Sequence, residues 1–389
     1  MKVIIIGAGV SGLTLAAALA QLAFQHEVEL YERDPSPGAR RRGYAISLKG
    51  DAGLAVLERL GLREAALAGG GQQVTNFVIN DRHGRTLLAL PSGDDASREI
   101  YRVQRDHLQL ALAEALPANS VRYGFQALGY EMLEGRCRVI FTGGRHADGD
   151  MIVGCDGVRS ALRRQLVDDQ LRFLGLSAIT GDAALTSEDP LLTGGYFMTL
   201  GDNGDSFFCY TQPGGVRFSY TSHVDATTLE STSQSELLDQ VRSATTDWHP
   251  LVGMITAAAD PDSIKPRGYY DRDPTKHVRD GNVWLIGDAA HPMSPFQGQG
   301  ANTAMLDAVA LAELLGSANL PADAQRVAAG IAARGRKAVL ESRRAAKQFH
   351  SPSRVQILSR NLGFRLTSAV INSRFTRRTT SRAETPAAP

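Results

Sequence analysis

Short aliphatic runs and helical patterns alternate from the start of the chain. Residues 1–6 are rich in β-branched residues, as is typical of a buried parallel strand. Residues 7–12 are rich in glycine and predict a tight turn, and residues 13–23 are rich in Ala and Leu and predict a helix. Residues 28–32 again have the pattern of a strand. These segments together predict one βαβ unit.

The rest of the pattern predicts a mixture of helices and strands. The further expected elements are helices at 51–62, 105–116, 301–315, 322–349 and 355–371, a hairpin at 74–90, and strands at 136–141, 150–153 and 283–286. Residues 173–223 combine strand patterns, aromatic residues and turns, which predicts a second domain built on a sheet. The tail from Arg374 is basic and then rich in Thr, Ala and Pro, so we expect it to be disordered.

Composition narrows the classes of partner. The 389 residues carry a net charge of +1, which provides no general field for nucleic acid, so no nucleic-acid partner is expected. The three cysteines lie far apart and the nine histidines are scattered, so we expect no disulfide framework and no metal site. No apolar segment approaches the roughly 20 residues that a bilayer span needs. A cytoplasmic protein, monomeric or weakly dimeric, is the expectation.

The first turn carries a dinucleotide-binding fingerprint. It fits GxGxxG between a strand and a helix, which is the context that the motif requires. The glycines allow a tight turn, close approach of a pyrophosphate and packing of helix on strand. The residues expected to bind here are Gly7, Gly9, Val10, Ser11 and Gly12. Glu32 ends the second strand, where an acid binds ribose hydroxyls and opposes a 2′-phosphate. This motif alone does not separate NAD from FAD.

A second motif makes the resemblance specific. Residues 287–292 (GDAAHP) and 295–302 (PFQGQGAN) follow a strand and precede a helix that contains Asp307. They closely resemble the GD motif of class A flavoprotein monooxygenases, the para-hydroxybenzoate hydroxylase family. The resemblance implies that Asp288 accepts hydrogen bonds from the ribityl chain of FAD and that the helix dipole faces the flavin. It also implies contacts from Pro295, Gly298, Gly300, Ala301 and Asn302. The motif also places His291 near the flavin, where a catalytic role and a role as a loop histidine bonded to backbone both stay open.

A third motif, residues 154–160 (GCDGVRS) followed by Arg163, resembles the DG motif of the same family. The resemblance ties Asp156 to binding of FAD and NAD(P)H, Arg105 to the pyrophosphate side, and Arg33 to the adenosine end. One of three consecutive arginines would reach the flavin or ribityl region. These are Arg40, Arg41 and Arg42, with Arg42 taken as the candidate.

The resemblance spans most of the first 315 residues and implies both fold and activity. The expected fold is α/β: a Rossmann-type FAD-binding domain with a parallel sheet, an inserted and mostly antiparallel β-sheet substrate domain, and C-terminal helices. The expected boundaries are 1–72, 95–170 and 275–320 for the FAD-binding domain, 73–94 and 171–274 for the substrate domain, 321–373 for the helices and 374–389 for the tail.

The implied activity is a monooxygenase that consumes NAD(P)H and O₂. A flavin C4a-hydroperoxide would transfer one oxygen atom to a small aromatic or polycyclic, polyketide-like molecule, so no catalytic protein nucleophile is expected. The pattern also resembles tetracycline-inactivating members and suggests antibiotic or secondary metabolism. An FAD-dependent reductase of isoprenoid double bonds and a non-catalytic FAD-carrying binding protein are the alternatives. A halogenase is disfavoured because the WxWxIP segment is absent.

The substrate would lie between the flavin and the sheet domain. Candidate pocket residues are Arg217, Tyr220 and His223, together with Phe197, Phe207, Tyr210 and Phe218, although core packing alone would also explain the aromatic residues. The basic amphipathic helix at 355–371 fits two interpretations, contact with an anionic membrane or packing of its apolar stripe across both domains. The second is favoured, so no membrane contact is expected.

Overall fold

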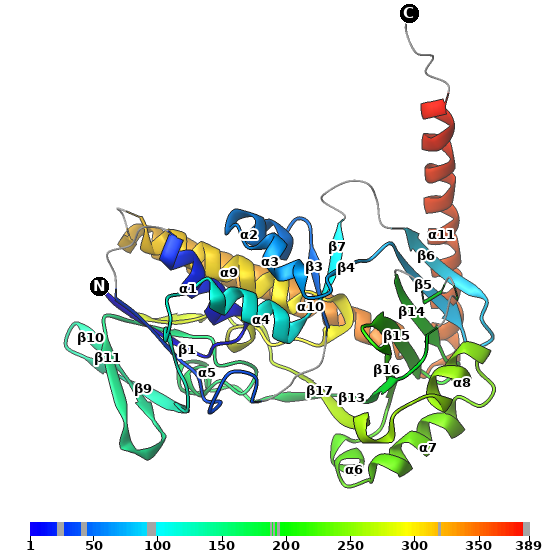
Figure 1. The fold of residues 1–389 in the computed structure, drawn as a ribbon, viewed down its shortest axis with the longest axis horizontal. Coiled ribbons are helices and arrows are strands. Elements are labelled where there is room, and N and C mark those ends of the chain that lie inside the picture. Colours follow the sequence, from blue (N-terminus) through cyan, green and yellow to red (C-terminus); the bar gives the residue numbers. More distant parts are fainter. Residues whose placement is uncertain are drawn as a thin grey trace, which may run out of the picture. The chain divides into compact units, whose positions relative to one another are not determined.

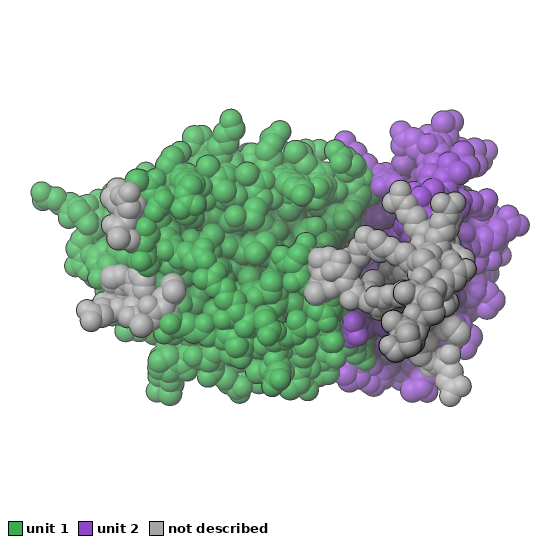
Figure 2. Space-filling view, turned by 90° about the horizontal axis from the view of Figure 1, so that it is seen from above, with its two compact units in different colours: residues 1–72, 95–174, 270–345 green, residues 73–94, 175–269, 346–389 purple. Residues whose placement is uncertain are grey.

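The fold was analysed in a computed structural model. It describes residues 1–21, 27–39, 45–91, 99–186, 189, 191–192, 195–317 and 320–383, with side chains left out at 91, 320–321 and 372–383. The chain divides into two compact units, which Figure 2 draws in green and purple. Unit 1 contains residues 1–72, 95–174 and 270–345, and unit 2 contains residues 73–94, 175–269 and 346–389.

Unit 1 is built on a six-stranded sheet in the order β18-β19-β12-β1-β2-β8. Its strands are β1 (Lys2–Ile6), β2 (Glu27–Tyr31), β8 (Val121–Arg122), β12 (Met151–Gly154), β18 (Arg279–Asp280) and β19 (Val283–Leu285). All neighbours are parallel except β18, which pairs antiparallel with β19. The strands bury nearly continuous aliphatic runs, because a parallel sheet is covered on both faces.

Helices cover this sheet, and α1 packs against α4 and α9 (Figure 1). The helices of unit 1 are α1 (Val10–Gln21), α2 (Gly53–Arg59), α3 (Arg63–Ala68), α4 (Arg105–Glu114), α5 (Ala161–Val167), α9 (Gly300–Leu315) and most of α10 (Leu320–Phe349). Two small sheets complete the unit: β3 (Ala45–Lys49), β7 (Ile100–Gln104) and β4 (Gln72–Gln73), and β9 (Ala127–Leu133), β10 (Arg136–Phe141) and β11 (His146–Gly149).

Unit 2 is built on a seven-stranded sheet in the order β17-β13-β16-β15-β14-β5-β6. Its strands are β5 (Asn76–Asp81), β6 (Thr86–Pro91), β13 (Arg172–Ala183), β14 (Gly195–Leu200), β15 (Ser206–Gln212), β16 (Gly215–Ser222) and β17 (Lys265–Asp271). The β14–β5 pair is parallel, whereas the β5–β6, β14–β15, β15–β16 and β13–β16 pairs are antiparallel. Helices α6 (Ala226–Glu230), α7 (Gln234–Ala244), α8 (Pro250–Ala257) and α11 (Arg354–Ala383) belong to this unit.

The expected fold class is confirmed, but several individual elements differ from the expectation. The helix predicted at 51–62 is the shorter α2, which ends at Arg59, and Gly61 then turns the chain with a φ of +65°. The sequence pattern did not reveal the helices α3, α5, α6, α7 and α8. The last helix continues to Ala383, past Arg374, where a disordered tail was expected.

Candidate functional site

Four sequence motifs follow four neighbouring parallel strands of unit 1. Along β19, β12, β1 and β2, these are the loop with Asp288, the loop with Asp156, the turn from Gly7 to Gly12, and Glu32. Parallel strands end at the same edge of a sheet, so the motifs are brought together at its carboxyl edge. In open α/β sheets this edge is where ligands bind.

The three fingerprint glycines have three different surroundings. Gly7 has a φ of +103°, and a Cβ there would lie 2.5 Å from the carbonyl oxygen of Cys155. A Cβ on Gly12 would lie 2.0 Å from the carbonyl oxygen of Gly7, so this glycine lets α1 pack on the turn. A Cβ on Gly9 would meet no atom within 4 Å. The space beside Gly9 is therefore open at the N-terminus of α1, where a helix favours an anion.

Glu32 holds the glycine turn in place. Its Oε2 accepts a hydrogen bond of 2.7 Å from the backbone N–H of Ala8, and its Oε1 accepts one of 2.9 Å from the N–H of Asp34. On the other side of the turn, the Gln109 amide of α4 donates to the carbonyl of Ala8 at 3.2 Å. Sequence reasoning did not identify Gln109, because its partner Ala8 lies 101 positions away in the chain.

Asp156 has one satisfied and one unsatisfied carboxyl oxygen. Its Oδ2 accepts the backbone N–H of Ala161, the first residue of α5, at 2.8 Å. Its Oδ1 is buried and has no hydrogen-bond partner in the described part of the chain. Burial raises the pKa of this carboxyl group. A buried acceptor without a donor is costly, so this oxygen has the environment of a group that receives a hydrogen bond from a ligand.

The loop after β19 places an exposed acid beside the start of α9. Asp288 is exposed, and its Oδ1 lies 3.8 Å from the position that a Cβ on Gly300 would take. Gly298 has a φ of +58°, and Pro295 opens the short helical turn before it. Ala301 lies in the first turn of α9, where backbone N–H groups have no partner within the helix. The expected GD loop thus has a carboxylate and a helix N-terminus close together.

The side chain of Asn302 is fully engaged within the protein. Its amide oxygen accepts from the backbone N–H groups of Lys49 at 2.9 Å and Gly53 at 3.0 Å. Its amide nitrogen donates to the carbonyls of Ser47 at 2.8 Å and Gly298 at 2.9 Å. All four hydrogen-bonding positions of the amide are therefore used. Asn302, expected to contact the cofactor, here ties β3 and α2 to the GD loop.

His291 is part of a buried ionic cluster behind the same loop. Its Nε2 hydrogen-bonds to Oδ2 of Asp307, and Arg334 of α10 donates to Oδ1 of Asp307 at 3.0 Å. Burial opposes protonation of His291, but the Asp307 charge and hydrogen bond prevail and raise its pKa. Of the two open roles for His291, these contacts favour a loop histidine that supports the GD loop.

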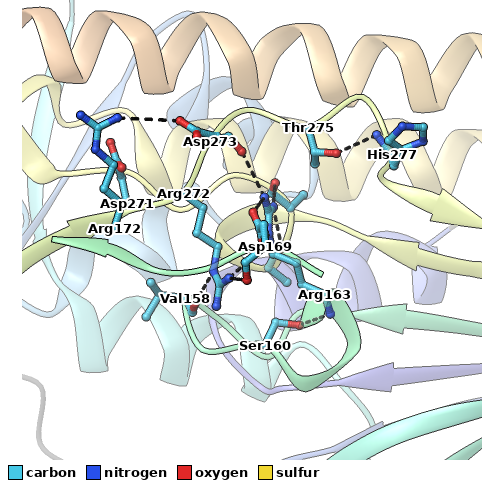
Figure 3. A network of polar contacts seen from close by, with 12 residues as sticks. Val158, Ser160, Arg163, Asp169, Arg172, Asp271, Arg272, Asp273, Thr275 and His277 are labelled. Carbon is cyan, nitrogen blue, oxygen red and sulfur yellow. Dashed lines mark hydrogen bonds and ion pairs between the residues drawn. The ribbon is translucent and has the colours of Figure 1, made fainter. Parts of the chain in front are cut away.

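Arg163 connects the DG and GD loops, as Figure 3 shows in part. Its guanidinium is fully buried, donates to the carbonyls of Ala289 and Ala290, and forms an ion pair with Asp169 at 2.5 Å. Asp169 also pairs with Arg272 at 2.7 Å, and Arg272 donates to the carbonyl of Val158 at 3.3 Å. One half-buried carboxylate, that of Asp169, thus holds the two arginines that bind the two loops. Asp169 and Arg272 were not identified from the sequence.

The remaining arginine candidates differ in exposure. Arg33 is exposed directly after Glu32, and Arg105 is the half-buried first residue of α4. Arg42, together with Arg40 and Arg41, lies outside the described residues. Ser11, also expected at the cofactor, is buried and faces Gly287, since a Cβ on that glycine would lie 2.9 Å from the Ser11 hydroxyl oxygen.

The residues at this edge fit FAD. The open space at Gly9 suits a pyrophosphate, and the buried acceptor of Asp156 and the carboxylates of Glu32 and Asp288 suit hydroxyl groups of ribose and ribityl. The N-terminus of α9 suits the negative charge of a reduced flavin. Among the described residues, no group of three or more His, Cys, Asp or Glu could hold a metal ion. Nor is any described helix both long and apolar enough to cross a bilayer.

In unit 2, the sheet has two different faces. One face packs on α7 and α8, and it buries Phe197, Phe207 and Phe218, each no more than 1% exposed. The opposite face carries a row of side chains across five strands, because residues in register point to the same side. This row is Phe77, Tyr196, Tyr210, Arg217 and Asp182. The candidates Phe197, Phe207 and Phe218 are therefore core residues, whereas Tyr210 and Arg217 lie in the row.

Aromatic contacts and an ion pair organise the row. Tyr196 is central, with ring centroids 6.2 Å from Phe77 and 6.0 Å from Tyr210, and 5.3 Å from Phe208, which also lies on this face. At the other end, Arg217 pairs with Asp182 through two parallel hydrogen bonds of 2.7 and 2.5 Å. The guanidinium charge is thereby largely neutralised by its neighbour.

Tyr220 and His223 lie elsewhere. Both line a cavity of about 630 Å³ in unit 2, next to α6 and α7. The Tyr220 hydroxyl donates to Asp205 at 2.5 Å, and burial together with this bond raises the pKa of the phenol. His223 hydrogen-bonds to the carbonyl of His350. These two candidates therefore lie apart from the row that carries Arg217.

Comparisons with known proteins agree with this geometry. A family model described as an FAD binding domain matches residues 1–329. The 3-amino-4-hydroxybenzoate 2-monooxygenase of Streptomyces cremeus is 30% identical over 378 residues, which are 94% of this chain and 92% of the relative. The FAD-dependent urate hydroxylase of Mycolicibacterium vanbaalenii is 26% identical over 317 residues, 80% of this chain and 78% of the relative. A crystal structure of a Klebsiella pneumoniae HpxO variant complexed with FAD has 25% identity and a TM-score of 0.85, covering 96% of this chain and 97% of that chain.

Proposed function

We propose that this chain, which belongs to the FAD-binding-domain family and is an FAD-dependent monooxygenase, hydroxylates a small aromatic molecule. NAD(P)H and O₂ are the co-substrates typical of the family. When bound, FAD supplies the redox chemistry, which is to accept hydride and to activate oxygen. The chain's own residues bind the cofactor, orient the substrate and exclude water.

The aromatic row in unit 2 carries the proposal for the substrate. Phe77, Tyr196 and Tyr210 lie on three neighbouring strands, about 10 Å from first to last at the usual strand spacing. The half-buried rings of Phe77 and Tyr196 offer stacking and edge-to-face contacts to a planar ligand, and Tyr210, which is 7% exposed, packs against Tyr196. A surface of this length accommodates one ring or a fused ring system. The two curated relatives described above are named for acting on the planar rings 3-amino-4-hydroxybenzoate and urate.

Polar groups near the row favour a ring with hydrogen-bonding substituents. The Tyr196 and Tyr210 hydroxyls can donate or accept hydrogen bonds. The Arg217–Asp182 pair limits the excess charge that this end of the row presents. We therefore expect hydroxyl- or amino-substituted aromatics to be better ligands than highly charged ones.

Matched ligand pairs would test the proposal. The purified flavoprotein is mixed anaerobically with NADH or NADPH in the presence of substituted benzenes, fused bicyclic aromatics, or their ring-saturated analogues. Oxygen labelled with ¹⁸O is then admitted. We expect an aromatic ligand to speed flavin bleaching and to be converted to a product that contains one labelled oxygen atom. Its saturated analogue should do neither.

Two outcomes would contradict it. Equal acceleration by aromatic and saturated ligands would remove the role of the aromatic row. A reduced product that contains no labelled oxygen would favour the alternative of a double-bond reductase.

A further inference from the structure

One face of α11 carries an apolar stripe that is exposed. Val355, Leu358, Leu362 and Leu366 are 75, 70, 60 and 60% exposed. Their spacing of three, four and four residues places them on one side of the helix. We call these four residues the α11 stripe. An apolar surface of this kind marks an interaction site more often than it marks a monomer surface.

The opposite side anchors the helix to unit 2. Ile357 is 5% and Phe364 is 8% exposed, and the Phe364 ring lies 6.1 Å from that of Phe349. The Ser368 hydroxyl accepts a hydrogen bond of 3.4 Å from the backbone N–H of Ala89 on β6. Packing within the chain therefore uses this second face. The expectation that the apolar stripe of this helix packs across both domains is wrong for the α11 stripe.

The charge of α11 indicates what covers the stripe. Residues 354–383 contain seven arginines and no acidic residue, in a chain whose net charge is only +1. Among the arginines whose side chains the structure describes, Arg354 and Arg365 flank the stripe, and Arg365 is 52% exposed although it lies 4.0 Å from Asp81. Arg360 instead is buried and donates to the carbonyl of Phe349. Pairing with α11 of a second copy would bring two such arginine-rich helices together, which like-charge repulsion opposes. A partner that complements both the apolar α11 stripe and the positive charge beside it has an apolar interior and a negatively charged surface.

We propose that α11 docks the protein on an anionic lipid surface. The α11 stripe would enter the boundary between headgroups and acyl chains, and the exposed Arg354 and Arg365 would contact the lipid phosphates. The helix would lie in the plane of the interface, because no described helix can span a bilayer. This proposal does not depend on the substrate, since it uses only the surface of unit 2.

Vesicle binding of the full-length FAD-loaded protein tests it. Large vesicles of phosphatidylcholine alone and of equal parts phosphatidylcholine and phosphatidylglycerol are sedimented with the protein in low and high salt. We expect binding to the anionic vesicles to exceed that to the neutral ones by at least about tenfold and to weaken with salt. The triple variant L358S/L362S/L366S should lose at least about tenfold in vesicle binding.

A matched variant controls for the loss of apolar surface. Leu110, Leu128 and Met132 are about half exposed elsewhere, so L110S/L128S/M132S removes similar side chains and should bind vesicles like the unchanged protein. Equal binding to neutral and anionic vesicles, or full binding by the α11 triple variant, would overturn the proposal. So would a protein that ignores both vesicles and forms a dimer that the α11 triple variant dissociates, because the second copy would then be the partner.

Discussion

The backbone N–H of Ala8 donates a hydrogen bond of 2.7 Å to Oε2 of Glu32. The acid at the end of β2 therefore holds the glycine turn that follows β1. In the usual account of this fold, the acid acts on ribose hydroxyls. Here one of its oxygens also holds the turn that is expected to meet the pyrophosphate. We therefore expect this one carboxylate to affect the binding of both parts of the dinucleotide.

Replacing Glu32 with Gln should weaken FAD binding. The amide keeps one acceptor oxygen but presents an NH₂ group to one of the two backbone donors, Ala8 or Asp34. Loss of a hydrogen bond to a charged acceptor costs about 1.5–3 kcal/mol, so the FAD dissociation constant should rise by roughly tenfold to a hundredfold. Quenching of flavin fluorescence measures it. Glu27→Gln removes the same charge at the exposed start of β2 and should leave the constant unchanged.

Adding a methyl group should have a different effect at each of two fingerprint glycines: it should reduce stability at Gly12 and flavin binding at Gly9. Gly12→Ala places a Cβ 2.0 Å from a backbone carbonyl and should destabilise the apoprotein by about 1–3 kcal/mol. Gly9→Ala meets no protein atom and should leave unfolding unchanged while reducing the flavin content of the purified protein. Thermal unfolding and the visible spectrum separate the two effects. Two variants that lose stability equally would refute the assignment of the space beside Gly9 to the cofactor.

The ion pairs of the half-buried Asp169 should make the free energy of unfolding fall at acid pH. Burial alone would raise the pKa of Asp169, but hydrogen bonds and charges from Arg163 and Arg272 prevail and lower it below its ordinary 3.8. A lowered folded-state pKa stabilises the protein above the unfolded value, and this contribution is lost as the pH falls through the folded value. Denaturant unfolding from about pH 7 down to about pH 2.5 should therefore show a steeper fall in the native protein than in Asp169→Asn.

The neighbouring residue provides the control for this measurement. Asp168 has a φ of +50°, a conformation that Asn also tolerates, so Asp168→Asn changes one carboxylate without straining the backbone. The free energy of unfolding of Asp168→Asn should fall with decreasing pH as it does in the native protein, because the Asp169 contacts stay in place. If Asp169→Asn showed the same fall in the free energy of unfolding at acid pH, the Arg163–Asp169–Arg272 cluster would not be the cause of that fall.

Two consecutive aromatic residues should separate folding from substrate binding. Phe197 is fully buried against α7 and α8, and Phe197→Ala should cost about 3–5 kcal/mol of stability. Tyr196 is half-buried on the opposite face, so Tyr196→Ala should cost only about 1–2 kcal/mol. The second variant should raise the KM for the aromatic substrate by about tenfold. Steady-state NAD(P)H oxidation and urea unfolding of both proteins check this, and an unchanged KM in Tyr196→Ala would contradict the proposed substrate surface.

The sequence by itself determined the parts of the protein whose requirements are local. A tight turn, a close approach and a helix start each need glycine at particular positions, so Gly7, Gly9 and Gly12 were recognisable from spacing alone. The acid after β2, the GD motif and the DG motif were also recognisable, because each is defined by particular residues at fixed spacing. Each follows a short aliphatic strand, and parallel strands with such motifs imply one shared edge.

The tertiary structure decided which of two faces a side chain occupies. In β14, both Tyr196 and Phe197 are aromatic, so the sequence has no polar alternation from which to assign a side. Only pairing across five strands and packing of α7 and α8 on one side separate the aromatic row from the core. In the same way, only the docking of α11 on unit 2 determines that Phe364 is buried and Leu362 is exposed.

Polar contacts between residues far apart in the chain also could not be predicted from the sequence. Asn302 binds backbone groups of residues about 250 positions away, and Arg163 binds the carbonyls of Ala289 and Ala290. Nothing near these residues in the chain indicates such partners, because a hydrogen bond depends on distance and angle in space and not on separation in sequence. The motifs therefore identified the cofactor, whereas folding decided which of their side chains are free to bind it and which hold the loops together.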